Sequence, residues 1–363
     1  MGLTDTRRRR VVFLVCYHPL KGFNVAPSDS SKKKMIICSQ DVQSVQYYGG
    51  FWHRDTLNVV SPMAEKVIYD SIDIPCGKCI GCRLDYSRQW ADRCLLESTY
   101  YDSNYFVTLT YDDKHLPLNY YLTEDGEEGV SATLVKKDLQ DFNKRLRKWQ
   151  DKEFSNKIRF YGCGEYGGQT HRPHYHVIYF GLILNDLVFY KRSSLGFDLY
   201  NSQSLTDIWD AGHVVVASVN WKTCAYVSRY VTKKLNGSYS AEYETFNFIP
   251  EFSVMSRRPG IGRQYYEDNK EHLFNTNFVS VPTLEGEKRI YPPNYFIDLL
   301  EDDDLELYTS LKEKRSSRAE SLSSLKLSLT DNDNLGMLES EEVVKLQKLK
   351  TLKRSDCSWQ GGK

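Results

Sequence analysis

The sequence predicts an α+β fold, and three patterns carry that prediction. Residues 105–111 are all β-branched, leucine or aromatic, which is typical of a central strand. Residues 135–149 repeat apolar side chains at steps of four and three between lysines and arginines, which indicates an amphipathic helix with a basic outer surface. Residues 158–163 and 175–180 indicate two further strands, joined by a glycine-rich link. Strands on both sides of a helix give an α+β order.

The rest of the chain falls into flanks around this core. Residues 84–101 lack glycine and proline and predict a helix directly after a cluster of cysteines. Thr133 is the candidate N-cap of the basic helix. We therefore expect an N-terminal flank without sustained period (1–70), a main domain that includes the cysteine cluster (71–265), a C-terminal extension of that domain (266–300) and a charged helical or disordered tail (301–363).

Composition limits the classes of protein that this chain can belong to. Its 363 residues carry 48 basic and 48 acidic side chains, so any nucleic-acid surface must be local. Nine cysteines, an odd number, favour reduced thiols or a metal over a secreted disulfide framework, and hence a reducing cytoplasm. The apolar run after the arginines at 7–10 stops at Tyr17, too short for a signal peptide or anchor. No stretch approaches the roughly 18 apolar residues of a membrane helix, so we expect a soluble protein.

A metal site is predicted by two histidines one residue apart. In a strand His174 and His176 point to the same face, so both imidazoles can reach one ion. Glu165 ends the preceding predicted strand and would lie beside them if the two strands pair. Two imidazoles and one carboxylate leave open positions on a divalent ion, as a catalytic site requires. The alternative is that the two histidines are ordinary side chains of a strand and bind no metal.

A nucleophile is predicted by two tyrosines one helical turn apart. Tyr226 and Tyr230 are spaced i and i+4, so both hydroxyls can serve one site. Phenol has an ordinary pKa of about 10, so a nearby cation or metal must help it lose its proton. Lys233 is the candidate catalytic cation, and Arg229 and Lys234 are candidate contacts for DNA phosphates. The alternative is that the tyrosines belong to the core.

The cysteine cluster is a candidate structural metal site. Cys76, Cys79 and Cys82 repeat at intervals of three, which favours a shared zinc ion over an iron–sulfur cluster. The fourth ligand is open. Cys94 is nearest in sequence but about 18 Å from Cys82 along a straight helix. Cys38, His53 and Cys16 are also candidates, but they are distant in the sequence and would require the N-terminal flank to fold back. The alternative to a metal is three reduced cysteines packed as small apolar residues.

Several blocks together resemble a known superfamily. The strand at 106–111, the pair His174 and His176, and the two tyrosines with their lysines occur in the order of the histidine-hydrophobe-histidine nucleases, with Tyr175 in the hydrophobe position. Over residues 75–265 the chain resembles the replication initiation proteins of the gokushovirus-type Microviridae phages. That closer resemblance is carried by three blocks: Cys76-Gly-Lys-Cys-Ile-Gly-Cys82-Arg83, Arg172-Pro-His-Tyr-His176 and Met255-Ser-Arg-Arg-Pro-Gly-Ile-Gly262.

This resemblance implies both a fold and an activity. The fold would be an antiparallel sheet of about five strands with helices on its faces, the metal ligands on central strands and the tyrosines on a facing helix. The 71–265 domain would be a tyrosine endonuclease that uses Mg²⁺ or Mn²⁺. It would nick the single-stranded phage origin, form a 5′-phosphotyrosine link and leave a 3′-hydroxyl for host polymerase; the second tyrosine would cut after one round, and strand transfer would close the circle. Its partners would be origin DNA and host helicase and polymerase, in the cytoplasm of the bacterial host.

Two other functions remain open at this stage. A plasmid initiator, relaxase or transposase of the same superfamily would share the site but serve another element. A non-catalytic phage protein that binds nucleic acid through a zinc knuckle would use the cysteines and leave the histidine and tyrosine blocks as coincidences. A nicking assay on single-stranded origin DNA separates these functions.

Overall fold

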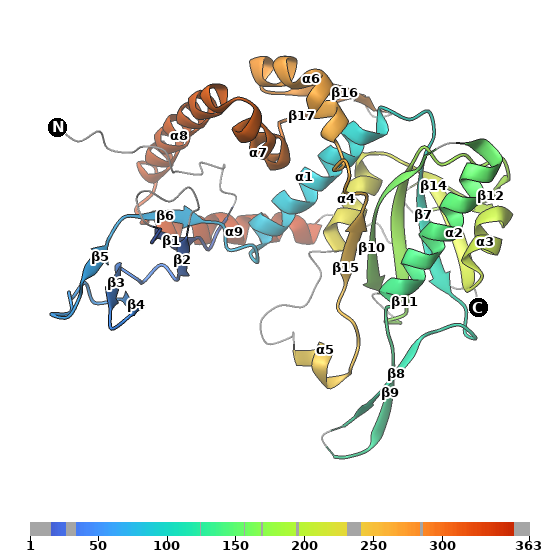
Figure 1. Ribbon diagram of the computed structural model, residues 1–363, viewed down its shortest axis with the longest axis horizontal. Helices are drawn as coiled ribbons and strands as arrows, with labels where there is room; N and C mark the ends of the chain where they lie inside the picture. Colours follow the sequence, from blue (N-terminus) through green and yellow to red (C-terminus); the bar gives the residue numbers. More distant parts are fainter. Residues whose placement is uncertain are drawn as a thin grey trace. The chain divides into compact units, whose positions relative to one another are not determined.

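The computed structural model describes residues 16–26, 34–123, 125–155, 157–167, 170–193, 196–230, 241–283 and 286–351 (Figure 1). The chain divides into two compact units. The terminal unit holds the described residues of Met1–Asp85 and Asp298–Leu352, and the central unit holds those of Tyr86–Ile297. Each unit is described by itself.

The central unit is built on a seven-stranded antiparallel sheet with the strand order β12-β13-β14-β7-β11-β10-β15. Its strands are β7 (Asn104–Tyr111), β10 (Arg159–Tyr166), β11 (Pro173–Phe180), β12 (Leu187–Arg192), β13 (Asp198–Ser202), β14 (Gly212–Ser218) and β15 (Phe252–Met255). The three strands predicted from the sequence are β7, β10 and β11, which lie side by side near the middle. The sheet is larger than the expected five strands because the β12–β13 hairpin adds two strands at the edge beyond β14.

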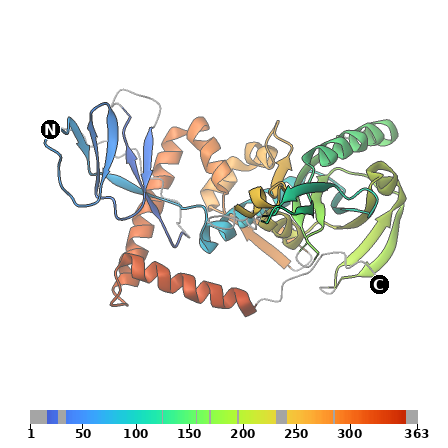
Figure 2. The same ribbon diagram turned by 90° about the horizontal axis from the view of Figure 1, so that it is seen from below.

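Helices cover both faces of this sheet because each strand alternates its side chains between two apolar layers. Val107, Val177 and their neighbours pack against α2 (Lys136–Phe154) and α3 (Gln203–Trp209). Phe106 and Ile178 pack on the other face against α4 (Trp221–Tyr230) and the central-unit part of α1 (Ile80–Ser98). Figure 2 shows α2 lying along one side of the sheet.

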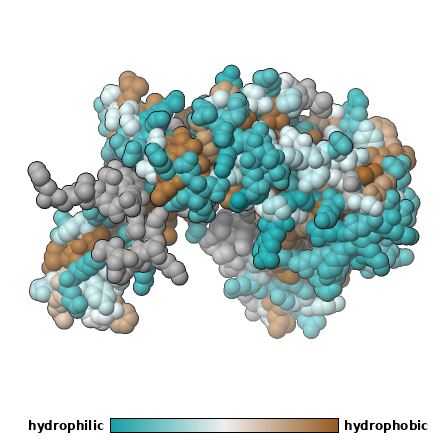
Figure 3. Space-filling model, turned by 45° about the horizontal axis from the view of Figure 1, so that its top comes forward, coloured by the Kyte–Doolittle hydropathy of each residue, from teal (hydrophilic) through white to brown (hydrophobic). Residues whose placement is uncertain are grey.

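The predicted basic helix is α2, and its outer surface is basic as expected. Leu139, Phe142 and Leu146 are buried, whereas its lysines and arginines between residues 136 and 148 are exposed. Hydrophilic residues predominate on the face drawn in Figure 3. The expected N-cap is wrong: the helix begins after Val135, and no side chain caps it. The Thr133 hydroxyl instead accepts a hydrogen bond of 2.9 Å from the backbone N–H of Ile249.

The remaining described elements of the central unit are short. They are the hairpin β8 (Leu118–Leu122) with β9 (Glu128–Ala132), α5 (Ala241–Thr245), α6 (Arg263–Thr276), the hairpin β16 (Val279–Thr283) with β17 (Gly286–Ile290), and α7 (Asn294–Asp303), which continues into the terminal unit. No helix among the described residues is both long and apolar enough to span a membrane.

The described residues of the terminal unit form two small sheets, two helices, and the adjoining ends of α1 and α7. One sheet has the order β2-β1-β6, formed by β1 (Leu20–Asn24), β2 (Met35–Cys38) and β6 (Ser71–Ile74). The other has the order β4-β3-β5, formed by β3 (Ser44–Tyr48), β4 (Phe51–Asp55) and β5 (Lys66–Ile68). A small apolar cluster around Phe23 and Val45 packs between them. The C-terminal stretch forms the largely exposed helices α8 (Leu305–Leu327) and α9 (Asn334–Thr351), and Glu342 pairs with His18 at 2.5 Å.

Candidate metal centre

The pairing of β10 with β11 brings the three predicted metal ligands together. In the antiparallel register Glu165 lies directly opposite His174, and His176 follows on the same face of β11. The Oε1 atom of Glu165 is 2.6 Å from Nε2 of His174 and 3.0 Å from Nε2 of His176. All three residues are buried, with at most 7% of their surface exposed. Glu165 and His174 therefore lie side by side although they are nine residues apart in the sequence.

The Nδ1 atom of each imidazole has a partner away from the carboxylate. Nδ1 of His174 lies 3.0 Å from the carbonyl oxygen of Arg172, to which it donates. Nδ1 of His176 lies 2.9 Å from the Thr108 hydroxyl, on the neighbouring strand β7. These bonds orient both rings so that Nε2 faces the carboxylate, an arrangement that is typical of histidines bound to metals.

The charge state of Glu165 suits a cation. Burial by itself raises the pKa of this carboxyl, but hydrogen bonds from His174 and His176, together with electrostatic attraction between the carboxylate and the two rings, outweigh burial. The net effect holds the pKa of Glu165 below its ordinary value, so the group is a carboxylate at neutral pH.

The donor atoms also fit the size of a small divalent ion. Six ligands about 2.1 Å from an ion place neighbouring donors about 3.0 Å apart. The two distances from the carboxylate oxygen are 2.6 and 3.0 Å, and the three donors lie within 4.8 Å of one another. Small movements of the side chains would admit an ion with positions left open for other ligands.

One predicted nucleophile lies against this centre. α4 packs on the face of the sheet that carries the histidines, and its Tyr226 ring meets the His176 ring edge to face, with centroids 5.1 Å apart. The Phe106 ring stacks on the His176 ring, with centroids 5.3 Å apart. It also meets the Tyr226 ring edge to face, with centroids 5.9 Å apart. Tyr226 is 7% exposed. It therefore packs in the apolar layer and beside the candidate metal ligands at the same time.

The other predicted residues of this block are placed only in part. Arg229 and Tyr230 are the last two residues of α4, but their side chains are not among those described. Lys233 and Lys234 lie outside the described residues.

Thr108 and Phe106 were not singled out from the sequence. The signal that could have found them is the alternation along residues 105–111, which puts Phe106 and Thr108 on one face. In the observed register that face carries the histidines, since Thr108 pairs with His176.

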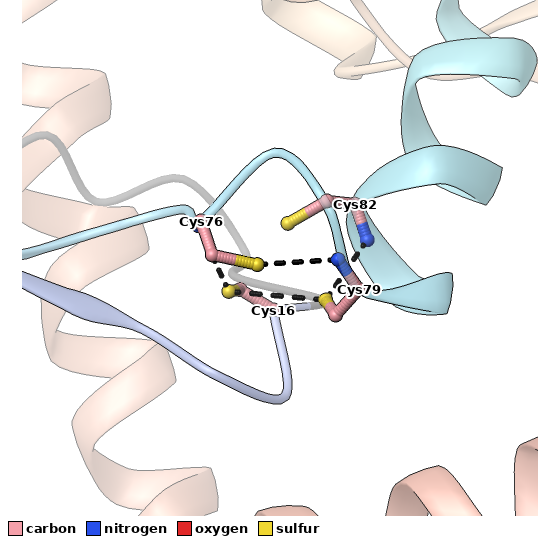
Figure 4. Close-up of side chains that lie close together, drawn as sticks. All are labelled: Cys16, Cys76, Cys79 and Cys82. Carbon is pink, nitrogen blue, oxygen red and sulfur yellow. Dashed lines mark hydrogen bonds between the residues drawn. The ribbon is translucent and has the colours of Figure 1, made fainter. Parts of the chain in front are cut away.

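The cysteine cluster gains a fourth member. Sulfur atoms of Cys16, Cys76, Cys79 and Cys82 all lie within 4.8 Å of one another (Figure 4). Cys94, the nearest candidate in sequence, instead packs in the apolar layer between α1, α4 and the sheet. The cluster lies in the terminal unit and the histidine centre in the central unit.

Comparison with known proteins places the chain in a family. The model of the replication-associated protein ORF2/G2P family matches residues 104–235, a segment that includes the candidate metal ligands and both tyrosines. The replication-associated protein ORF2 of Spiroplasma virus 4 is 34% identical over 256 residues, which cover 70% of this chain and 75% of the relative. This chain belongs to the phage replication-associated proteins of the Microviridae type.

Two further members of the replication-associated family are similar over more than half of the chain. The replication-associated protein VP4 of Bdellovibrio phage phiMH2K is 33% identical over 212 residues, which cover 58% of this chain and 63% of the relative. The replication-associated protein ORF4 of Chlamydia phage 1 is 29% identical over 255 residues, which cover 67% of this chain and 59% of the relative. No solved structure matches the chain significantly.

Proposed function

We propose that this protein starts rolling-circle replication of a circular single-stranded DNA phage genome by nicking the origin with a tyrosine and staying linked to the 5′ end. The observation that carries this proposal is the contact of the Tyr226 ring with the His176 ring, 5.1 Å between centroids, beside the donor set of Glu165, His174 and His176. A nucleophile and a place for a cation thus lie side by side on facing elements.

Glu165, His174 and His176 would hold the ion. A set of two imidazoles and one carboxylate suits Mn²⁺ and, through its open positions, accepts Mg²⁺. When bound there, the ion supplies positive charge that polarises an oxygen of the scissile phosphodiester. The protein contributes ring orientation through Thr108 and the Arg172 carbonyl, and its buried strands keep the donors in place.

The chemical step balances without an energy source. The tyrosine hydroxyl gives up its proton, its oxygen forms a bond to phosphorus, and the bond from phosphorus to the 3′ oxygen breaks. That oxygen takes a proton and becomes a 3′-hydroxyl, while the phosphodiester persists as a 5′-phosphotyrosine. We assign Lys233 to assist the deprotonation and Arg229 and Lys234 to hold DNA phosphates. Reversal of the step with another 3′-hydroxyl joins DNA ends.

Two tyrosines fit a cycle with two cleavages. Tyr226 and Tyr230 are one helical turn apart in α4, a spacing that lets both hydroxyls serve one site. One tyrosine would make the first nick, and the other would cut after a full round so that strand transfer closes the circle.

The type of genetic element that the protein serves is inferred from its relatives. Three phage replication-associated proteins match the chain, which favours a phage element over a plasmid initiator, relaxase or transposase. The DNA partner is then the single-stranded phage origin. Host polymerase extends the 3′-hydroxyl, together with host helicase, in the cytoplasm of the bacterial host. The exposed lysines and arginines of α2 offer a surface for phosphates.

A cleavage assay tests the proposal. Overlapping single-stranded oligonucleotides that tile the encoding genome are labelled at both ends in turn and incubated with the full chain and Mn²⁺ or Mg²⁺. We expect cleavage at one site, a free 3′-hydroxyl on the upstream fragment and a protein adduct on the downstream 5′ end. DNA binding without cleavage at any site would instead support the non-catalytic alternative.

A further inference from the structure

Four cysteine sulfurs face a common centre in the terminal unit (Figure 4). Cys76 follows strand β6, Cys79 precedes α1, and Cys82 lies in the first turn of α1. Cys16 comes from 60 residues earlier in the chain, yet its sulfur accepts a 3.2 Å hydrogen bond from the backbone N–H of Cys76. The segment at residues 16–17 therefore lies against the cluster.

The spacing of the sulfurs suits a single tetrahedral ion. Thiolates bind zinc at about 2.3 Å, so four of them at the corners of a tetrahedron stand about 3.8 Å apart. The sulfurs of Cys16 and Cys79 are 4.0 Å apart, and all four lie within 4.8 Å of one another. This separation is about twice the length of a disulfide bond, and all four cysteines are free thiols. A four-iron cluster would need wider spacing, because each sulfur would bind a different iron.

The backbone around the cluster is arranged to stabilise thiolates. Cys76 Sγ accepts hydrogen bonds from the N–H groups of Lys78 and Cys79, at 3.4 and 3.2 Å. Cys79 Sγ accepts from the N–H groups of Tyr17 and Cys82, at 3.4 and 3.5 Å. The tight turn that makes this possible has Gly77 at a φ of 72°, a conformation that glycine adopts without strain. Peptide dipoles directed at sulfur favour its negative form, which is the form that binds metal.

We propose that Cys16, Cys76, Cys79 and Cys82 form a closed structural zinc site. Four thiolates complete a tetrahedron and leave no open position, which is the pattern of a structural rather than a catalytic zinc. Such an ion would fasten the segment at residues 16–17 to the turn before α1. The site is separate from the histidine centre and does not depend on the proposed nicking activity.

The experiment must separate zinc at the cysteines from zinc at the histidines. The full chain carrying His174→Ala and His176→Ala, which removes the second donor set, is purified without added metal and its zinc is measured by mass spectrometry. We expect about one zinc per chain. Replacement by cobalt should then produce a charge-transfer absorption band from thiolate to metal, a band that imidazole and carboxylate ligands do not give.

A matched pair of variants identifies the fourth ligand. Adding Cys16→Ala should remove the zinc and the charge-transfer band, whereas Cys38→Ala, a buried cysteine of the same unit in the apolar cluster of its small sheets, should keep both. Retention of zinc and an unchanged cobalt spectrum in Cys16→Ala would overturn the proposal, as would folded protein without zinc or thiolate–metal absorption.

A second measurement covers failure of the Cys16→Ala chain to fold. X-ray absorption at the zinc edge of the parent chain should give four sulfur neighbours at about 2.3 Å. Three sulfurs with one nitrogen or oxygen would refute the four-cysteine site. The cleavage assay on the wild-type chain reads the histidine centre independently, so the two proposals can fail separately.

Discussion

Replacing Thr108 by valine tests how the protein orients the proposed metal ligand His176. The Thr108 hydroxyl lies 2.9 Å from Nδ1 of His176, and both residues are buried, at 5% and 0% exposure. Valine keeps the shape of threonine but removes this hydrogen bond. Loss of such a partner to a metal-binding imidazole typically weakens metal affinity 10- to 100-fold, which is about 1.4–2.7 kcal/mol.

The assay is calorimetric titration of Mn²⁺ into wild-type protein and Thr108→Val. Thr110→Val is the matched control, because Thr110 is also buried, lies two residues along β7 on the same face and pairs with His174 in the sheet. Among the described residues its hydroxyl makes no hydrogen bond to an imidazole. We expect the Mn²⁺ dissociation constant to rise about 10- to 100-fold in Thr108→Val only. Equal affinities in Thr108→Val and wild type, or equal losses in both variants, would refute the assigned role of the hydroxyl.

Two further predictions concern the ligands and the residue between them. Chelation, His174→Ala or His176→Ala should abolish cleavage of origin DNA, and Glu165→Gln should weaken Mn²⁺ binding less because the amide keeps an oxygen but loses the charge; full cleavage in a chelator would exclude the metal role. Tyr175→Phe removes a buried hydroxyl that bonds the backbone N–H and carbonyl of Val135 at 3.0 and 2.9 Å, so we expect urea denaturation to show a loss of about 1–3 kcal/mol. Because Tyr175 points to the opposite face of the sheet from the histidines, the folded variant should keep its Mn²⁺ affinity, and a loss would contradict the assigned faces.

The centre of the fold could be predicted because its signals are local. Long apolar or aromatic runs gave β7, β10 and β11, and the period of two along β11 put both histidines on one face. Glu165 could be added because two consecutive strands joined by a short glycine-rich link pair as neighbours. The register then places Oε1 of Glu165 2.6 Å from Nε2 of His174, although the two residues are nine apart in the sequence.

The remainder depends on contacts between residues far apart in the sequence. The described strands within the first 74 residues are three to five residues long, too short to show a sustained period. The fourth cysteine could not be chosen because the meeting of Cys16 with Cys76 depends on how that whole segment folds back. Thr133 failed as a cap for the same reason, since its hydroxyl bonds Ile249, 116 residues later.

The covalent adduct is the most direct measurement of the central claim. Origin DNA labelled at its 3′ end, so that the label stays on the downstream fragment, is incubated with wild-type protein, Tyr226→Phe, Tyr230→Phe, the double variant and Tyr161→Phe as the control. Tyr161 is a buried tyrosine of the same apolar cluster as Tyr226, so its replacement reports on packing alone. We predict an adduct with wild type and the control, impaired joining with each single variant, and no adduct with the folded double variant. A phosphotyrosine link formed by the double variant would contradict the account.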